Sequence, residues 1–485
     1  MRVDLRAHPT RTGARRADLA RSVAPVLAAL RESAVGMGGT RVVCDWVQYR
    51  DNFREVVDLR PILPSDADAE GGIEVAVDAR RAGEVPLRER TAALLRDRAP
   101  GRVALEDWDL GDRGCVWRLN ELYWRELDLW EKSTGRGYEQ ALPGGQSDAR
   151  NRDAARELIG ELFGVWDRLA DAGTLPERLY VVELGVGNGG QAAVFLDELA
   201  AMDAAHGRGY YRRLQYLMCD YSRYVLDLAG QTVADHRERV SSLALDATRP
   251  TTSLGFLRSE VFLVYVSNVY DNLPTDEVAQ LGGRTYRVQT RAYLPAAEAV
   301  ALAESVRASV AELPALVHKL SRLGPGLLAE AAPERFHDVD AAVLFWRRVW
   351  SAVRLAERYA PIAGLDDYPV APTVSGAELA PLLESGGDLR MHVSNGALAS
   401  FSDSLALLHP AGRLICHDLF VTETQGYRAG FRGPGKYDGS VVNWVNGPLL
   451  GHVARRRGFE VSFAPFAHRA GGNIVTMTAR ATAPA

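Results

Sequence analysis

Cysteine is scarce in this sequence, and its spacing excludes two kinds of small stabilised fold. The 485 residues include only four cysteines. No two of them form a Cys-x-x-Cys pair, and two lie in apolar, strand-like runs. We therefore expect buried free thiols, with neither a disulfide framework nor a metal site.

The sequence also lacks long apolar runs and an excess of one charge. No apolar stretch approaches the length of about 18 residues that would indicate a membrane span. The 57 basic residues nearly balance the 62 acidic ones, and the net charge of −5 gives no reason to expect nucleic-acid or membrane binding. The segment Met1–Ala20 is Arg-rich but has no apolar core, so it does not resemble a secretory signal. A cytoplasmic location is expected.

The first 101 residues predict a small α+β unit. Apolar residues recur at helical spacing from Arg15 to Glu32, and strand-like runs follow over residues 40–47, 55–63 and 73–77. No residue of this unit indicates a chemistry. Formation of a homodimer is one role that we expect for it.

Residues 102–170 predict a helical connector that acts as a lid over a cofactor. Helical spacing places five apolar residues on one helix face: Leu119, Leu122, Tyr123, Leu127 and Trp130. This pattern favours a packing helix between domains over an aromatic substrate box.

From residue 171 onward, strands alternate with helices, as they do in a parallel, Rossmann-like α/β sheet. The predicted strands are Leu179–Leu184, Gln215–Asp220, Val240–Leu245, Val261–Ser267, Arg413–Asp418, Glu460–Phe463 and Asn473–Thr478. The last two are too close in sequence for a helical crossover, so they should form an antiparallel hairpin. A large insertion at about residues 285–405 is mainly helical by pattern, with helices over 296–313, 314–323 and 339–359. We interpret it as a substrate cap.

A glycine-rich turn follows the first of these strands. Gly185, Gly187 and Gly190 fit the dinucleotide pattern G-x-G-x-x-G, so the glycines alone do not identify a ligand. Glu183 stands two residues before the first glycine. A carboxylate there repels a pyrophosphate but suits the cationic methionyl end of S-adenosylmethionine. The turn therefore favours S-adenosylmethionine over a nicotinamide dinucleotide.

Two aspartates end the next strands. Asp220 can accept hydrogen bonds from both ribose hydroxyls, or it can cap the helix that begins near Tyr224. Asp246 can accept the adenine amino group, and an ordinary turn or helix cap is nearly as good an interpretation.

The fourth strand runs into the polar segment Asn268-Val-Tyr-Asp271-Asn-Leu-Pro274. Asn268 and Asp271 lie where a methyl acceptor would meet the cofactor, and carboxylates there could hold a protonated nitrogen. For Asp276 and Glu277, which follow Pro274, N-capping of a helix is the favoured interpretation over catalysis.

These segments resemble the MidA-type S-adenosylmethionine-dependent methyltransferases, a family that includes a mitochondrial arginine methyltransferase for complex I assembly. Three stretches carry the resemblance: the helix Glu157–Trp166, the loop Val182–Gly189 and the segment Asn268–Pro274. The family's glutamate after the asparagine is missing, and Val186 replaces a proline. The resemblance implies a class I methyltransferase fold of five parallel strands and an antiparallel hairpin. It also implies a cofactor role for Glu183, Gly185, Gly187, Asp220 and Asp246, and an acceptor-side role for Asn268 and Asp271.

The predicted cofactor-binding residues are Glu183, Gly185, Gly187, Gly189, Asp220, Ser222, Asp246 and Ser267, and the predicted catalytic residues are Asn268, Asp271, Tyr437 and Asp438. Tyr437 and Asp438 belong to a Gly-rich segment, residues 426–446, that could fold over the acceptor or form a mobile surface loop. The leading hypothesis is N-methylation of a guanidino group, on arginine or a related small molecule. Two alternatives are an O-methyltransferase that uses His392 or His417 as a base, and an assembly factor that binds the cofactor and a partner protein.

Overall fold

The computed structural model of the chain describes residues 1–6, 14–33, 39–64, 71–97, 101–137, 151–384, 387–428, 433–468 and 472–482. Part of the predicted connector, residues 138–150, and residues 429–432 of the predicted Gly-rich loop lie outside these ranges. Tyr437 and Asp438 lie within them.

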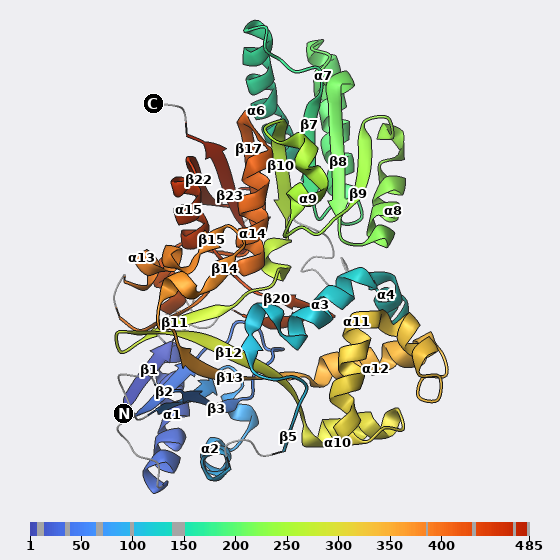
Figure 1. Cartoon of the computed structure of the whole chain (residues 1–485). Coiled ribbons are helices and arrows are strands. Elements are labelled where there is room, and N and C mark those ends of the chain that lie inside the picture. The colour runs from blue at the N-terminus through green and yellow to red at the C-terminus, as the bar shows by residue number, and fades with distance from the viewer. Residues whose placement is uncertain are drawn as a thin grey trace.

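The upper part of the molecule in Figure 1 is a sheet of seven described strands in the order β22-β23-β17-β10-β7-β8-β9. Their bounds are β7 Leu179–Leu184, β8 Leu214–Asp220, β9 Val240–Ala244, β10 Val261–Ser267, β17 Leu408–Asp418, β22 Phe459–Pro465 and β23 Val475–Ala481. The strands from β17 to β9 pair in parallel, and β23 runs antiparallel to both of its neighbours. Five parallel strands with an antiparallel hairpin confirm the class I methyltransferase fold.

Helices cover both faces of this sheet, which explains why its central strands are almost wholly apolar. One face packs against α6 (Arg152–Asp171), α7 (Gly190–His206) and α8 (Arg223–Thr232). The other packs against α9 (Pro250–Leu254), α14 (Asn395–Ser404) and α15 (Gly447–Arg456). The carboxyl ends of the parallel strands are therefore an edge of the sheet at which a ligand can enter.

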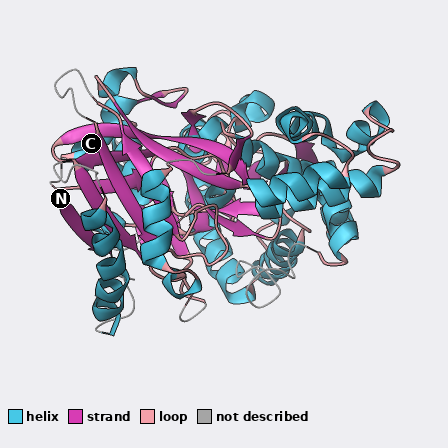
Figure 2. Ribbon diagram, turned by 90° about the horizontal axis from the view of Figure 1, so that it is seen from below, coloured by secondary structure: helices cyan, strands magenta, loops and turns pink. Residues whose placement is uncertain are grey.

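A second sheet, of ten described strands, joins the N-terminal segment to the insertion (Figure 1). Its strands are β1 (Arg2–Arg6), β2 (Thr40–Asp45), β3 (Val57–Ile62), β4 (Gly72–Asp78), β5 (Arg102–Ala104), β6 (Asp109–Leu110), β11 (Glu277–Leu281), β12 (Arg284–Pro295), β13 (Arg354–Pro361) and β16 (Leu389–His392). The first 101 residues, expected as a separate unit, thus share a sheet with the insertion, through the pairing of β3 with β13. Figure 2 shows this sheet from below, with helices on one of its faces. The helices α1 (Ala14–Glu32) and α2 (Leu87–Arg96) share a core with β2, β3 and β4.

The helical part of the insertion consists of α10 (Ala296–Ser305), α11 (Leu313–Ala331) and α12 (Val339–Ala352). The helix predicted over Val339–Tyr359 ends at Ala352, and β13 takes the rest. The reason is visible in the sequence of β13, since Leu355, Glu357 and Tyr359 alternate on one buried side of the strand. The N-capping role of Asp276 and Glu277 is also wrong, because β11 and not a helix begins at Glu277.

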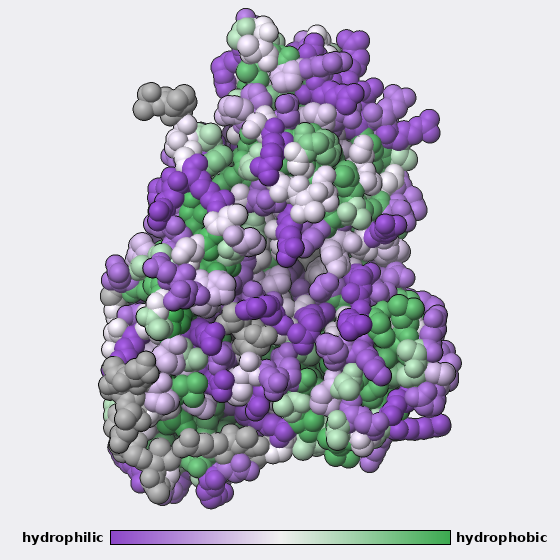
Figure 3. Space-filling model, viewed as in Figure 1, coloured by the Kyte–Doolittle hydropathy of each residue, from purple (hydrophilic) through white to green (hydrophobic). Residues whose placement is uncertain are grey.

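The connector contains α3 (Cys115–Arg125) and α4 (Leu127–Thr134), which lie below the seven-stranded sheet and above α11 in Figure 1. Its predicted packing face is confirmed, because Leu119, Leu122, Tyr123, Leu127 and Trp130 are each at most 4% exposed and join a core with α11 and α12. Figure 3 shows apolar surface over these two helices of the insertion, where Leu327 and Leu344 are exposed. None of the helices in the described ranges is both long and apolar enough to cross a membrane.

Shorter elements complete the structure. They are α13 (Ala380–Leu383) and the strand pairs β14 (Pro369–Ala371) with β15 (Val374–Ser375), β18 (Phe420–Val421) with β21 (Val445–Asn446), and β19 (Gly435–Tyr437) with β20 (Ser440–Val442).

Glu357 of β13 is the centre of a buried network of ion pairs. Its carboxylate contacts Arg60 Nε at 2.7 Å, Arg54 Nη2 at 3.2 Å and Arg390 Nη1 at 2.9 Å. Burial alone would raise the pKa of Glu357, but Arg390, Arg54 and Arg60 lower it well below its ordinary value. The carboxylate therefore stays ionised and links the N-terminal strands to the insertion.

Replacing Glu357 with glutamine should destabilise the protein, because three buried guanidinium groups lose their common counter-charge. We expect the free energy of unfolding to fall by about 3–5 kcal/mol, measured by urea denaturation at pH 7. The exposed Glu304 of α10 offers a matched control, and Glu304→Gln should change stability by less than about 0.5 kcal/mol. Equal stability of the two variants would contradict the central role of Glu357.

Candidate functional site

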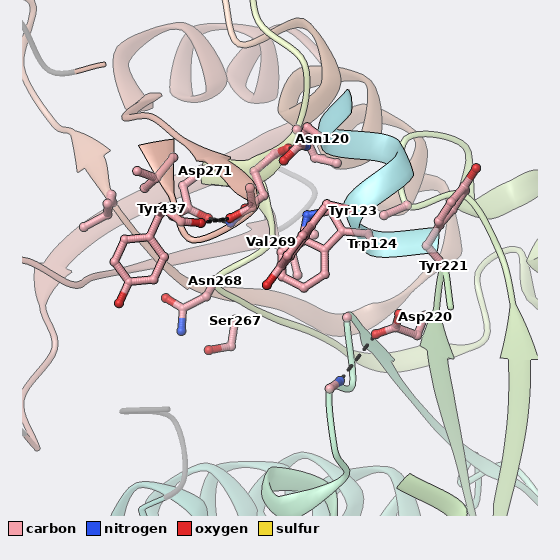
Figure 4. A pocket seen from close by; sticks show the side chains of 18 of the residues that line it. Asn120, Tyr123, Trp124, Asp220, Tyr221, Ser267, Asn268, Val269, Asp271 and Tyr437 are labelled. Atoms are coloured by element: carbon pink, nitrogen blue, oxygen red, sulfur yellow. Dashed lines mark hydrogen bonds between the residues drawn. The ribbon is translucent and has the colours of Figure 1, made fainter. Parts of the chain in front are cut away.

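A cavity of about 750 Å³ lies at the carboxyl edge of the seven-stranded sheet. Its walls come from the β7–α7 turn, the ends of β8, β9 and β10, helix α3, and residues 437–444. Figure 4 shows Tyr437 and Asn268 on one side and Asp220 with Tyr221 on the other, with Tyr123 and Trp124 of α3 between them. Volumes of this order hold drug-sized ligands.

The glycine turn after β7 forms one wall. Gly185 and Gly187 have φ values of 74° and 57° and line the cavity. A Cβ atom on Gly185 would lie 2.3 Å from Val269 Cγ2, so the turn and the end of β10 pack too closely for any side chain there. Gly189 has a different role: it begins α7 against Ala229 and does not line the cavity.

Glu183 is buried at the end of β7, where its Oε2 accepts a 2.7 Å hydrogen bond from the Tyr216 hydroxyl. Burial raises the pKa of Glu183 to about 8, and the nearby Asp220 adds to the effect. Without a cation beside it, the carboxyl group is largely protonated at neutral pH. Because Glu183 also lines the cavity, it is placed to ionise when a cationic group enters.

Asp220 follows on β8 and lines the same wall. Its Oδ2 accepts the Gly187 amide at 3.4 Å, and its Oδ1 accepts the Ser222 amide at 3.0 Å. Burial raises the pKa of Asp220 to about 6. The cap of α8 is Ser222 and not Asp220, because the Ser222 side chain accepts the amide of Val225. Ser222 itself does not line the cavity, since it is turned to this cap.

Asp246, after β9, holds a turn and also lies at the cavity. It lines the cavity, and its Oδ1 also accepts hydrogen bonds from the Thr248 amide at 2.8 Å and the Thr248 hydroxyl at 2.7 Å. One carboxylate oxygen thus holds the turn.

The end of β10 supplies two polar side chains to the cavity. Ser267 lines it, and its Oγ is buried without a hydrogen-bond partner in the described part of the chain. Asn268 has a φ of 52°, and its amide donates to the His417 carbonyl of β17 at 2.9 Å. Asparagine tolerates this left-handed conformation better than most residues. Both side chains are therefore available to a ligand.

Asp271 and Asp418 form a buried carboxyl pair behind this segment. Asp418 ends β17, and its Oδ2 accepts the amides of Val269, Tyr270 and Asp271 at 3.1, 2.8 and 3.3 Å. Burial raises the pKa of Asp418 to about 6. Burial and the charge of Asp418 raise the pKa of Asp271 well above its ordinary value. Asp271 lines the cavity, so the pair presents one shared proton site to it.

Tyr437 and Asp438 both line the cavity, but Asp438 is engaged elsewhere. Its Oδ2 accepts the Trp130 indole N–H at 3.1 Å and the Tyr123 hydroxyl at 3.3 Å. Asp438 therefore anchors the α3–α4 connector to the segment that carries Tyr437.

Several residues that line the cavity were not predicted from the sequence. Trp117 and Trp124 of α3 and Trp444 line the cavity, and Gln48 and Tyr49 reach it from the N-terminal segment. Only α3 had a usable signal, its aromatic cluster. The two histidines considered as bases are not among the described lining residues. His417 Nδ1 instead contacts Thr476 Oγ1 at 2.9 Å, and burial lowers the pKa of His417 to about 4.

Comparison with known proteins gives distant structural likeness only. No protein-family model matches the sequence. No curated protein matches it either. A protein from Burkholderia thailandensis bound to S-adenosyl-homocysteine is similar in structure, with 15% identity, a TM-score of 0.46, and coverage of 77% of this chain and 88% of that one. The CcbJ methyltransferase from Streptomyces caelestis has 11% identity and a TM-score of 0.34, covering 75% and 99% of the two chains. At these TM-scores the likeness does not establish the fold, which rests on the strand order of the sheet.

A methyl group at Gly185 should disrupt this wall. Gly185→Ala combines an unfavourable φ with an overlap on Val269, so we expect a loss of stability of about 1–3 kcal/mol in urea denaturation. Gly160, within α6, has open space around it. Gly160→Ala should be neutral or stabilising by up to about 1 kcal/mol. A neutral Gly185→Ala variant would show that the turn is not closely packed on β10.

Proposed function

We propose that this chain is an S-adenosylmethionine-dependent methyltransferase whose cavity holds the cofactor beside a small acceptor. The observation that carries the proposal is the placement of Glu183 and Asp220 at the ends of adjacent parallel strands, beside a glycine turn that has no room for a side chain at Gly185. The class I sheet order supports it.

The residues present fit this cofactor. Glu183 offers a buried carboxyl group that a cationic amino group would ionise and pair with, whereas a pyrophosphate would gain no such charge pair there. Asp220 can accept hydrogen bonds from ribose hydroxyls, and Asp246 can accept one from an adenine amino group. The Ser267 hydroxyl, which has no partner among the described residues, can bond to a polar ligand atom. S-adenosylmethionine, when bound, supplies an electrophilic methyl group on a positively charged sulfur.

For the acceptor, we propose a guanidino nitrogen of arginine or of a related small molecule. The aromatic side chains Trp117, Tyr123, Trp124 and Tyr437 around the cavity can stack against a planar cation. Asn268 and Asp271 offer oxygen atoms that can orient its N–H groups. The Asp271–Asp418 pair shares one proton and keeps one negative charge near neutral pH, and the carboxylate that stays ionised can take up the proton that the nitrogen must lose. The resemblance to MidA-type enzymes supports the same acceptor.

An O-methyltransferase that depends on a histidine base is less well supported, because the described lining of the cavity contains no histidine. We further propose that α3 acts as a lid over the cofactor, packed against α11 and α12 of the insertion. The insertion over residues 285–405, expected as a substrate cap, contributes none of the described lining residues of the cavity. A homodimer built on the N-terminal segment remains part of the proposal.

Binding of S-adenosylmethionine should release a proton. At pH 7 the Glu183 carboxyl group is protonated before binding, and a cationic group beside it lowers its pKa, so close to one proton should leave per molecule bound. The release should diminish as the pH rises above 8. Calorimetry in two buffers of different ionisation enthalpy measures it, and Glu183→Gln should abolish it. Binding without any buffer dependence would refute this role of Glu183, and no response to S-adenosylmethionine or S-adenosyl-homocysteine would refute the function itself.

Asp271→Asn should abolish turnover but leave cofactor binding within about threefold, because Asp271 serves the acceptor and not the cofactor. Incubation with methyl-labelled cofactor and free arginine, followed by mass spectrometry, detects the product. Asp227→Asn, on the exposed side of α8, is the matched control and should keep full activity. Undiminished turnover by Asp271→Asn would contradict the assignment, and a wild-type product on oxygen would favour the alternative acceptor class.

A further inference from the structure

Three arginines gather on one face of the central part of the ten-stranded sheet, away from the cavity. Arg287, Gln289 and Arg291 occupy alternate positions of β12 and therefore share one face of that strand; the two arginines are half-buried, and Gln289 between them is buried. Arg358 of β13 stands directly opposite Gln289 in the antiparallel register. Arg358 is thus the diagonal neighbour of both other arginines, at a separation that long side chains bridge. None of the three lines the cavity.

Trp108 organises two of these arginines. The guanidinium carbon of Arg358 lies 4.5 Å from the centre of the Trp108 ring, and that of Arg291 lies 4.8 Å from it. Stacking on an indole holds a guanidinium group in place while leaving its N–H edge free. The two positive charges are therefore held near one another instead of turning apart into solvent.

Their charge is not neutralised by the described part of the chain. No ion pair there involves Arg287, Arg291 or Arg358. The Nε of Arg291 is buried and lacks an acceptor. Arg358 has one neutral partner, since its Nε donates to Gln289 Oε1 at 2.8 Å. Burial lowers the pKa of Arg358, and the charges of Arg291 and Arg287 lower it further.

The opposite face of the same strands makes the contrast plain. There Glu357, the neighbour of Arg358 on β13, pairs with Arg54, Arg60 and Arg390. Among the described side chains, carboxylates thus pair with the arginines of one face and not with these three on the other. A positive cluster that is fixed in place and uncompensated has an electrostatic cost, and an anionic ligand would offset it.

We propose that Arg287, Arg291 and Arg358, organised by Trp108 and Gln289, form a binding site for the phosphate group of a small ligand. Guanidinium groups match phosphate oxygens with paired hydrogen bonds, and three of them suit a multivalent phosphate better than a single carboxylate. A small ligand fits better than a nucleic acid, because the chain as a whole carries a net charge of −5 and would repel a long polyanion.

Titration calorimetry of the full chain with pyrophosphate at low ionic strength tests the site. Arg358→Gln and Arg291→Gln should each weaken binding at least about tenfold, as expected when one charge-assisted contact is lost. Arg348→Gln removes an equal charge from the exposed side of α12 and should leave the affinity unchanged. Both cluster variants should unfold close to the wild-type temperature, since relief of like-charge repulsion offsets the lost stacking on Trp108, so a loss of binding at an unchanged unfolding temperature cannot be ascribed to misfolding.

Three results would overturn the proposal: no binding of pyrophosphate, equal weakening by Arg348→Gln, or citrate bound as tightly as pyrophosphate. Tighter binding of a single-stranded RNA oligonucleotide, lost in Arg358→Gln, would instead make this face a nucleic-acid surface and refute the small-ligand assignment.

Discussion

The molecule depends on one buried carboxylate, that of Glu357. Three arginines that are distant in sequence converge on it, two from the N-terminal segment and Arg390 from β16. The pairing of β3 with β13 is a single register contact, between Ile62 and Tyr359. Few backbone hydrogen bonds join these two strands, so the ion pairs of Glu357 hold the N-terminal segment against the insertion. Because a buried charge is costly unless it is matched, these partners define where the insertion lies against the first hundred residues.

That position determines the shape of the cavity. The ten-stranded sheet carries the connector below the edge of the seven-stranded sheet, so α3 faces the glycine turn and the end of β10 (Figure 1). Asp418 acts on the same space from the other side, since it holds three consecutive amides after Asn268 with one oxygen atom. One wall of the cavity thus carries the glycine turn and the acidic strand ends, and the opposite wall carries aromatic and carboxyl groups. Two different sheets position these two walls.

The sequence predicted what local patterns encode and missed what long-range pairing creates. The apolar strands, the glycine turn and the acidic strand ends could be predicted, because each depends on residues that are neighbours in the sequence. Gly189 and Ser222 were predicted to bind the cofactor. In the structure Gly189 packs against Ala229, and the Ser222 side chain caps α8. Asp418 went unnoticed, since nothing near it in sequence shows that it accepts the amides of another strand. The strand β12 alternates clearly, but its long helical neighbours suggested a helical insertion.

The second sheet also constrains how the chain can be made. Strand β3 is complete by residue 62, whereas its partner β13 begins at residue 354, almost three hundred residues later. During synthesis the edge of β3 therefore stays unpaired for that interval, and Arg54 and Arg60 have only their N-terminal partners, Asp45 and Glu74, in place of Glu357. Such late closure is slow and leaves an edge open to wrong pairing. A chain with this order of strands therefore exposes that edge until translation has passed the insertion.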